Sequence, residues 1–327
     1  MTAMVTLRDI EAAQRHIGGE ILRTPLRPSH ALSRLAGVPV HLKLENRQKT
    51  GSFKLRGATN AIRSLGEEAR SRGLVTASTG NHGRAVAFAA QAMGARAVVC
   101  LSALVPANKV EAIRGLGADV RIVGTSQDDA MREVERLVRE EAMCFVPPFD
   151  DAAVIAGQGT LGLEIADDLP ETALVLVPLS GGGLASGVAA AIRGRRPDAR
   201  IIGVSMERGA AMAASLEAGR PVEVQEVETL ADSLGGGIGL DNRLTFPMCR
   251  ALLDDVILLD EAEIAAGIRH AANVEGEVVE GAGAVGIAAL LAGRIRPHGP
   301  TAIVVSGGNI DPAVHRAIVD DAKAGAA

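Results

Sequence analysis

The sequence predicts an α/β protein made of two domains, each with a parallel twisted sheet covered by helices. Short apolar segments that are typical of strands alternate with segments of helical periodicity along almost the whole chain. Such alternation favours parallel sheets with helices on both faces. The length of 327 residues and the hydrophobic content of 47% provide enough apolar material for a large core.

The predicted strands follow one another at regular intervals. They occupy residues 40–45, 74–78, 95–101, 118–124, 144–148, 173–179, 200–206, 255–260 and 301–308. Helical patterns lie between them, as at residues 81–94, 107–117 and 126–141. Residues 207–254 combine many glycines with mixed periodicity and give no clear prediction.

The stretch PPFDDAAVIAGQGT, residues 147–160, interrupts this alternation. Here the chain is expected to leave one sheet and enter another. We therefore predict a small domain near residues 71–149. The large domain would combine residues 1–70 with residues 150–327.

Composition excludes several classes of function. The net charge is −5, there is no long basic run, and the only aromatic residues are five phenylalanines, which argues against nucleic-acid binding. No apolar run is long enough to span a membrane, and no secretory signal is visible. The three cysteines are not spaced for a disulfide or a metal. A cytoplasmic protein is expected.

The stretch TGSFKLRGATNAI, residues 50–62, contains a lysine at an unusual position. Ser52 is the expected N-cap of an apolar-periodic helix, so Lys54 falls in the first turn. The helix macrodipole disfavours a cation there. Lys54 is either a solvated lysine at a small cost or a lysine whose lowered pKa suits Schiff-base catalysis.

A glycine loop follows the strand LVLVPL. Ser180, Gly181, Gly182 and Gly183 lead from this strand directly into a helix. Glycines let backbone N–H groups approach an anion closely, and the helix N-terminus adds positive potential. A phosphate is the predicted ligand; the alternative is a tight turn between strand and helix.

Two further loops place polar residues after strands. TASTGNHGRA, residues 76–85, predicts a second anion site or an ordinary N-cap, and His82 taken alone suggests a structural role. VVSGGN, residues 304–309, delivers Ser306 to the carboxyl edge of its sheet, where open α/β sheets hold ligands.

Two interpretations account for these loops. In a nicotinamide-dependent oxidoreductase, Glu207 at the end of the next strand would bind a ribose, but Ser186 occupies the third glycine position of the G-x-G-x-x-G pattern. In the other, the glycine loop holds a phosphorylated aldehyde cofactor that binds a lysine covalently. This second interpretation also uses Lys54 and the loop before His82.

Five motifs resemble the threonine/serine dehydratase and serine racemase family of fold-type II (tryptophan synthase β-like) pyridoxal-phosphate enzymes. SFKLRGA, STGNHG, IAGQGT, SGGGL and VVSGGN appear in the family's order, and the resemblance covers residues 5 to 315. It implies a pyridoxal 5′-phosphate (PLP) lyase that dehydrates a β-hydroxy amino acid by α,β-elimination. It also suggests a homodimer.

The resemblance implies roles for individual residues. Lys54 would bind the cofactor covalently and act as the base at Cα, with Phe53 packed on the pyridine ring. Asn81 would bind the ring hydroxyl and Ser306 the pyridine nitrogen. The phosphate would be held by Ser180, Gly181, Gly182, Gly183 and Leu184. The substrate carboxylate would be bound by Ser78, Thr79, Gly80 and His82.

The departures from the family concern racemisation and a metal. Thr79 stands where racemases place a serine that acts as the second acid. Glu207 matches a family position for a divalent-cation ligand, with the carbonyl of Ala211 nearby in sequence, but the expected acidic partner is Ala213. Because the sequence ends soon after Asn309, the C-terminal regulatory domain of biosynthetic threonine dehydratases is expected to be absent.

A closer resemblance is to the dehydratase group of hydroxyectoine utilisation. Residues 203–212, 230–246 and 279–290 carry it. The group implies a ring-opened hydroxyectoine derivative as substrate, because a Schiff base needs a free primary amine. The alternatives are a general L-threonine/L-serine dehydratase and a serine racemase.

Overall fold

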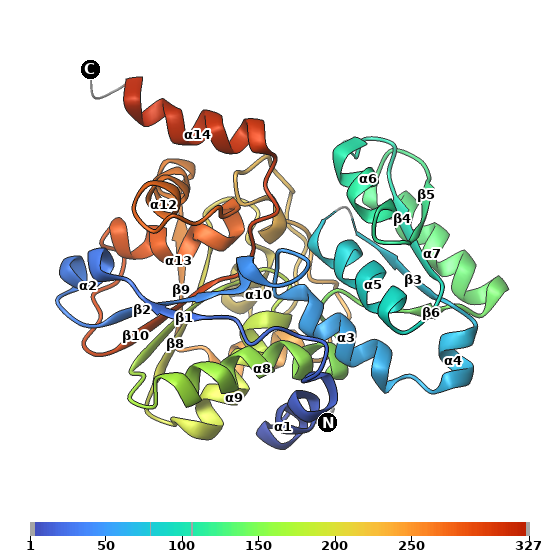
Figure 1. The fold of residues 1–327 in the computed structure, drawn as a ribbon, viewed down its shortest axis with the longest axis horizontal. Helices are drawn as coiled ribbons and strands as arrows, with labels where there is room; N and C mark the ends of the chain where they lie inside the picture. The colour runs from blue at the N-terminus through green and yellow to red at the C-terminus, as the bar shows by residue number, and fades with distance from the viewer. Residues whose placement is uncertain (1–3, 79, 106, 325–327) are drawn as a thin grey trace.

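The computed structural model describes residues 4–78, 80–105 and 107–324, which form two lobes that lie side by side (Figure 1). Within these residues, one lobe contains a six-stranded sheet in the order β1-β2-β10-β7-β8-β9, and the other a four-stranded sheet in the order β5-β4-β3-β6. The α/β class predicted from the sequence is confirmed.

The strands lie close to their predicted positions. In the larger sheet they are β1 (Leu26–Pro28), β2 (Val40–Leu44), β7 (Leu174–Pro178), β8 (Arg200–Met206), β9 (Asp255–Leu259) and β10 (Thr301–Val305). In the smaller sheet they are β3 (Leu74–Ala77), β4 (Ala97–Leu101), β5 (Asp119–Ile122) and β6 (Cys144–Phe145). The pairs are parallel except that β1, which was not predicted, runs antiparallel to β2.

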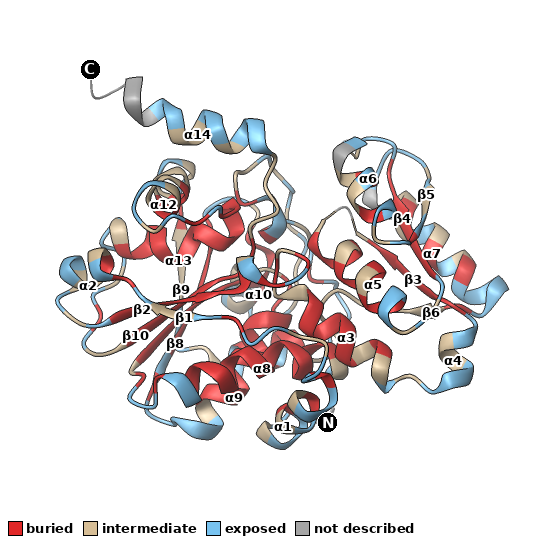
Figure 2. Ribbon diagram, viewed as in Figure 1, coloured by how far each residue is buried: buried red, intermediate tan, exposed pale blue. Residues whose placement is uncertain are grey.

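Helices cover both faces of each sheet. In the larger lobe, α8 and α9 lie on one face and α12 and α13 on the other (Figure 1). Buried residues concentrate in the strands and on the helix faces toward them (Figure 2). The α-helices are α1 (Leu7–Ile17), α2 (His30–Ala36), α3 (Lys54–Ser64), α4 (Glu67–Ser71), α5 (Asn81–Ala92), α6 (Ala107–Arg114), α7 (Gln127–Glu141), α8 (Ala152–Asp168), α9 (Gly183–Arg195), α10 (Ala211–Ala218), α11 (Thr245–Leu252), α12 (Glu261–Asn273), α13 (Gly281–Leu291) and α14 (Pro312–Ala324).

The segment without a sequence prediction, residues 207–254, contains α10, the 3-10 turn Asp232–Leu234 and α11, joined by long loops. Among the described residues, none of the helices is both long enough and apolar enough to cross a membrane.

The start of α3 differs from its prediction. Phe53 is the N-cap residue and makes no capping hydrogen bond with its side chain. Ser52 instead forms an isolated bridge with Gly307, and its Oγ is buried without a hydrogen-bond partner among the described residues. The pairing with the end of β10 holds Ser52 in this position, so the prediction that Ser52 caps the helix was wrong.

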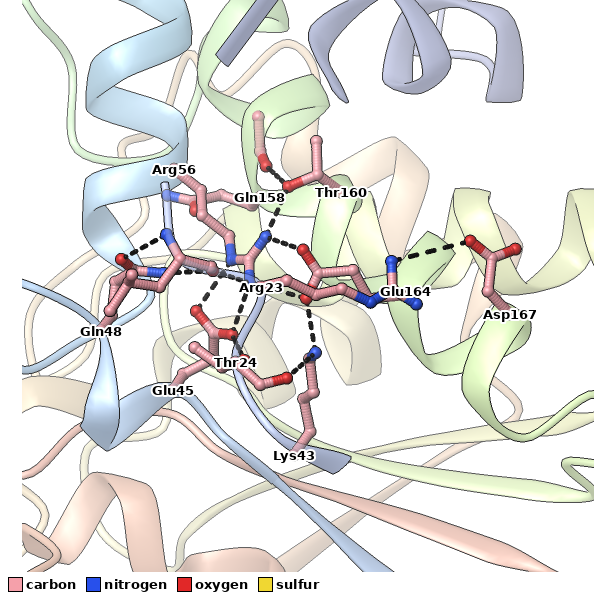
Figure 3. Close-up of polar contacts among 12 residues, drawn as sticks. Arg23, Thr24, Lys43, Glu45, Gln48, Arg56, Gln158, Thr160, Glu164 and Asp167 are labelled. Carbon is pink, nitrogen blue, oxygen red and sulfur yellow. Dashed lines mark hydrogen bonds and ion pairs between the residues drawn. The ribbon is translucent and has the colours of Figure 1, made fainter. Parts of the chain in front are cut away.

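A buried ionic cluster fixes the first turn of α3 (Figure 3). Both Nη atoms of Arg56 donate to Glu164 on α8, at 2.7 and 2.9 Å. Its Nε and Nη2 donate to the two carboxylate oxygens of Glu45, each at 2.8 Å. Lys43 on β2 also donates to Glu164 and, at 2.7 Å, to the carbonyl of Thr24. The cluster therefore joins β2, α3 and α8 two residues from Lys54.

Candidate active site

Lys54 lies where the two lobes meet. Its Nζ donates to the carbonyl oxygen of Pro148 at 2.7 Å and lies 5.4 Å from the ring centre of Phe53. Burial lowers the pKa of the Lys54 amine from 10.5 to about 8. With this pKa about a tenth of the amine is uncharged at pH 7 and about half at pH 8, and the uncharged form is the nucleophile and proton acceptor.

The predicted phosphate loop lies beside Phe149, the residue after Pro148. A Cβ added at Gly181 would lie 2.5 Å from the Phe149 ring, so the loop can pass Phe149 only without a side chain there. Gly182 has φ +89°, a conformation that favours glycine. Because α9 begins at Gly183 without a side-chain cap, its first N–H groups are free to bind an anion.

The loop residues are partly or fully buried. Ser180 is partly buried, and Gly181, Gly182, Gly183 and Leu184 are buried. The sequence therefore produces an uncapped helix N-terminus lined by backbone, with one hydroxyl at its entrance, which fits a phosphate group.

The second predicted anion site is the start of α5. Its N-cap residue, Gly80, provides no side-chain cap, and the Gly80 N–H lies 3.4 Å from the Oγ of the partly buried Ser78. The N–H groups of Asn81 and His82 belong to this uncapped first turn, which suits a carboxylate. Thr79, also predicted to bind there, lies outside the described residues.

The His82 side chain is buried and neutral. Its Nε2 lies 2.9 Å from the carbonyl oxygen of Val146, so Nε2 carries the proton. Burial, then the neighbouring charge of Lys54, lowers its pKa to about 3. Its Nδ1 is buried with no partner among the described residues. A carboxylate would therefore be bound by the His82 backbone N–H rather than by the ring.

Ser306 lies beside the start of the lysine's helix, and Asn81 begins α5, which packs against that helix. The carbonyl of Ser306 accepts from the N–H of Phe53 at 3.0 Å, which fixes the end of β10 beside the start of α3. The Ser306 hydroxyl is buried and lies 3.4 Å from the carbonyl of Ala282. Asn81 is buried and donates from Nδ2 to Glu280 at 2.7 Å.

Glu207 is not part of this assembly. It follows β8 and is exposed, and its Oε1 lies 3.8 Å from Nη2 of Arg294. Among the described residues, no three His, Cys, Asp or Glu side chains are grouped so that they could hold a metal ion. With Ala213 in place of a second carboxylate, the donors near Glu207 do not fit a divalent cation. We do not propose a metal there.

Pro148, Phe149, Glu280 and Asn309 belong to the site but were not predicted individually. Pro148 and Phe149 lie in the stretch that interrupts the alternation of strands and helices. There the sequence predicted that the chain passes from one sheet to the other, and it gave no sign that these two residues belong to a functional site. Glu280 had one visible signal, a carboxylate between apolar and small residues in VEGAGA.

Comparison with known proteins places the chain in a family. Residues 17–307 match the family described as "Pyridoxal-phosphate dependent enzyme". A "Putative threonine dehydratase" of Sinorhizobium fredii is 60% identical over 97% of this chain and 96% of the relative. An "L-threonine ammonia-lyase" of Thermotoga maritima is 44% identical over 94% of this chain and 76% of the relative.

Solved structures of similar proteins support the same family assignment. The maize serine racemase structure superposes with a TM-score of 0.92 at 32% identity, covering 99% of this chain and all of the other (100%). The processed form of threonine deaminase isoform 2 from Solanum lycopersicum superposes with a TM-score of 0.90 at 33% identity, covering 97% of this chain and 87% of the other. These matches favour the aldehyde-cofactor interpretation over a nicotinamide enzyme.

The residues described above fit PLP. The partly buried amine of Lys54 suits its aldehyde, the start of α9 suits its phosphate, and the neutral hydroxyl of Ser306 suits a ring nitrogen that is not forced to carry a proton. With the family match over residues 17–307, this chain is a fold-type II pyridoxal-phosphate-dependent lyase of the threonine dehydratase family.

Proposed function

We propose that this enzyme eliminates water from a β-hydroxy amino acid and releases a 2-oxo acid and ammonia. The observation that carries the proposal is the position of the Lys54 amine, which lies near His82 in the first turn of α5 and donates to Pro148, the residue before the Phe149 that packs against the glycine loop of α9. Both of these helices begin without a side-chain cap. One N-terminus suits the phosphate of the cofactor and the other the carboxylate of the substrate.

When bound, PLP supplies an aldehyde carbon for the substrate amine and a ring that withdraws electrons from Cα. The Nζ of Lys54 takes the Cα proton, since it is the amine with a lowered pKa at the site. The first turn of α5 holds the substrate carboxylate and so fixes which Cα bond faces Lys54.

The bonds that break are Cα–H and Cβ–O, and the β-hydroxyl leaves as water after gaining one proton, which balances the proton that Lys54 takes from Cα. The electron pair of the Cα–H bond forms the new Cα–Cβ double bond. The resulting unsaturated amine rearranges and is hydrolysed by water to the 2-oxo acid and ammonia. Because the hydroxyl leaves with the electron pair of the Cβ–O bond, negative charge does not have to remain at Cα, and the weak electron sink that a neutral Ser306 allows is sufficient.

We further propose a ring-opened hydroxyectoine derivative as the preferred substrate. The resemblance carried by residues 230–246 supports it. A Cβ added at Gly237 would have no heavy atom within 4 Å, and at Gly236 the nearest is 3.8 Å away. Gly237 is exposed, so the loop is open at these positions, as the acceptance of a substrate larger than threonine would require. L-threonine or L-serine is the second candidate, favoured by the names of the relatives.

A direct comparison of substrates tests both proposals. Protein loaded with PLP is given L-threonine, L-serine, hydroxyectoine and its ring-opened hydroxy-diamino acid derivatives, and ammonia and 2-oxo acid are measured. Preference for a ring-opened derivative supports the hydroxyectoine assignment. Faster turnover of threonine contradicts that assignment but keeps the elimination. Interconversion of serine enantiomers without ammonia release contradicts the elimination and indicates a racemase.

We also propose a cytoplasmic homodimer. Val274 and Val278 are each more than half exposed, at 55% and 56%, as apolar residues at an interface would be in a separate chain. A molecular mass of one chain in light scattering would contradict the dimer.

A further inference from the structure

Glu280 is a buried carboxylate at the junction of the two lobes. It is 4% exposed and is the N-cap residue of α13. Its Oε1 accepts from Nδ2 of Asn81 at 2.7 Å, and its Oε2 accepts from the backbone N–H of Asn309 at 3.1 Å. Asn81 belongs to the smaller lobe and Asn309 follows β10 of the larger one, so this carboxylate joins both lobes.

The hydrogen bonds around Asn81 form a series in which each donor and acceptor is determined, from Arg84 at one end to Glu280 at the other. Arg84, which has only donors, donates to Oδ1 of Asn309 at 2.9 Å. Nδ2 of Asn309 donates to Oδ1 of Asn81 at 2.5 Å and to the carbonyl of Thr50 at 2.9 Å. Nδ2 of Asn81 then donates to Glu280, which as a carboxylate only accepts.

Arg84, which only donates, and Glu280, which only accepts, determine the orientation of the amide of Asn81 between them. Since its Oδ1 faces Asn309 and one hydrogen of its Nδ2 faces Glu280, its second Nδ2 hydrogen is the group left to donate to a ligand. If the Glu280 carboxylate were lost, the amide of Asn81 could rotate and present its oxygen instead.

We propose that Glu280 is a positioning residue for the cofactor, which orients Asn81 so that its remaining N–H donates to the ring oxygen of PLP. The proposal deepens the proposed function, since it rests on PLP bound at Lys54. A donor to this oxygen stabilises its deprotonated form and strengthens cofactor binding. Glu280 itself need not touch the cofactor.

The ionisation of Glu280 provides a pH signature. Burial and then Asp232 raise its pKa to about 7, while Asn81, the N–H of Asn309 and Lys109 act in the opposite direction. Arg84 also faces this carboxylate. As the pH falls through this value, Glu280 gains a proton and its hold on Asn81 weakens. We expect the visible spectrum of the bound cofactor to change near pH 7 for this reason.

The test uses the full chain loaded with PLP. The wild type and Glu280→Gln are compared by the visible spectrum across pH 5.5–9, on the order of one to two pH units on each side of the Glu280 pKa, and by equilibrium PLP binding. We expect Glu280→Gln to lose the spectral step near pH 7 and to bind PLP about tenfold more weakly. Glu280→Asp should recover part of the step. Protein side chains do not absorb visible light, so the visible spectrum reports the cofactor, and without Trp or Tyr the near-ultraviolet absorbance of the chain is weak as well.

Two controls separate orientation from general destabilisation. Glu277→Gln removes another buried carboxylate, which binds Arg27 and Arg47 and not Asn81, and should leave the pH step unchanged. In Asn81→Ala the step should be absent, and adding Glu280→Gln should cause no further change. An unchanged step in Glu280→Gln, or the same loss in Glu277→Gln, overturns the proposal.

The outcome does not depend on the substrate assay. If no β-hydroxy amino acid is turned over but the spectral step depends on Glu280, the proposed reaction fails and the positioning role stands. If Lys54→Ala keeps the visible cofactor spectrum and the PLP affinity of the wild type, PLP is not bound at Lys54 and both proposals fail.

Discussion

The reactivity of Lys54 depends on its burial and on the neutrality of His82. Because His82 remains uncharged above pH 3, it adds no positive charge beside the amine at neutral pH. The lowered pKa of Lys54 is therefore the effect of burial alone. An amine in this environment reacts at a lower pH than an exposed lysine does.

We predict that acylation of Lys54 in the cofactor-free protein rises about tenfold per pH unit and levels off near pH 8. The protonated amine is not a nucleophile, so the rate follows the free-base fraction up to the pKa. Competitive labelling with acetic anhydride, read by mass spectrometry, measures it, with the exposed Lys49 as an internal reference. A rate that still climbs at pH 10 would mean that burial does not lower the pKa.

Individual residues could be predicted from the sequence where their role depends on local position, and could not where it depends on contacts with distant segments. Lys54 was found because a cation in a first helical turn is unusual. Glu280 was not, because its role depends on Asn81 and Asn309, which lie far away in the sequence. Ser52 was assigned as a cap because the pattern shows local spacing, whereas its bridge with Gly307 joins distant segments.

The phosphate loop acts as an element rather than as separate residues, since its backbone conformation makes the site. A Cβ added at Gly182 would lie 2.7 Å from Met212, and the residue has φ +89°. We predict that Gly182→Ala weakens PLP binding by at least about tenfold and destabilises the fold by roughly 1–3 kcal/mol. Equilibrium dialysis and urea unfolding measure the two effects.

Gly237→Ala is the matched control for Gly182→Ala, because a Cβ at Gly237 has no neighbour within 4 Å. We expect it to leave both quantities unchanged. If Gly182→Ala bound PLP as the wild type does, the loop would not be the phosphate site.

The start of α3 depends on the ionic cluster in Figure 3. Arg56 is 1% exposed, Glu45 is 0% exposed, and both carboxylates bound by Arg56 lie in a low-dielectric interior. We predict that Arg56→Leu lowers the free energy of unfolding by roughly 3–5 kcal/mol, because two buried carboxylates would lose the guanidinium that they share. Glu164 would keep its ion pair with Lys43, whereas Glu45 would lose its ion pair. Urea unfolding of the cofactor-free protein measures this.

An exposed arginine provides the comparison. Arg136 on α7 makes ion pairs with Glu133 and Glu140 while 37% of its side chain is exposed. Arg136→Gln should change the free energy of unfolding by less than about 1 kcal/mol, because solvent screens such pairs. Equal losses for both variants would contradict the role given to burial.

At the scale of the whole molecule, the alternation of strands and helices predicted the architecture because buried parallel strands are short and strongly apolar. β1 was missed because three residues at a sheet edge carry little pattern. The loops of residues 207–254 could not be assigned, since packing against the larger lobe rather than periodicity holds them. The division into two domains at residues 71–149 remains a prediction, although the smaller sheet is built from residues 74–145.

The two lobes supply different parts of the site, and this makes a prediction about the whole chain. The smaller lobe contributes the start of α5, and the larger lobe contributes the start of α9 and Ser306. A cofactor that contacts both lobes should reduce the motion of the contacted segments in both lobes when it binds. We predict that adding PLP to cofactor-free protein slows amide hydrogen exchange in the first turns of α5 and α9 together, and leaves the exposed helix α14 unchanged.

Hydrogen exchange followed by mass spectrometry distinguishes this coupling from its alternatives. Lys54→Ala should give weaker protection in both turns, because the covalent bond is lost while the phosphate and ring contacts remain. Protection of α9 alone would show that the cofactor belongs to the larger lobe only, and Asn81 would then have no cofactor role. Protection of α5 that disappears in Glu280→Gln while that of α9 persists would show that Glu280 carries the effect of the cofactor into the smaller lobe.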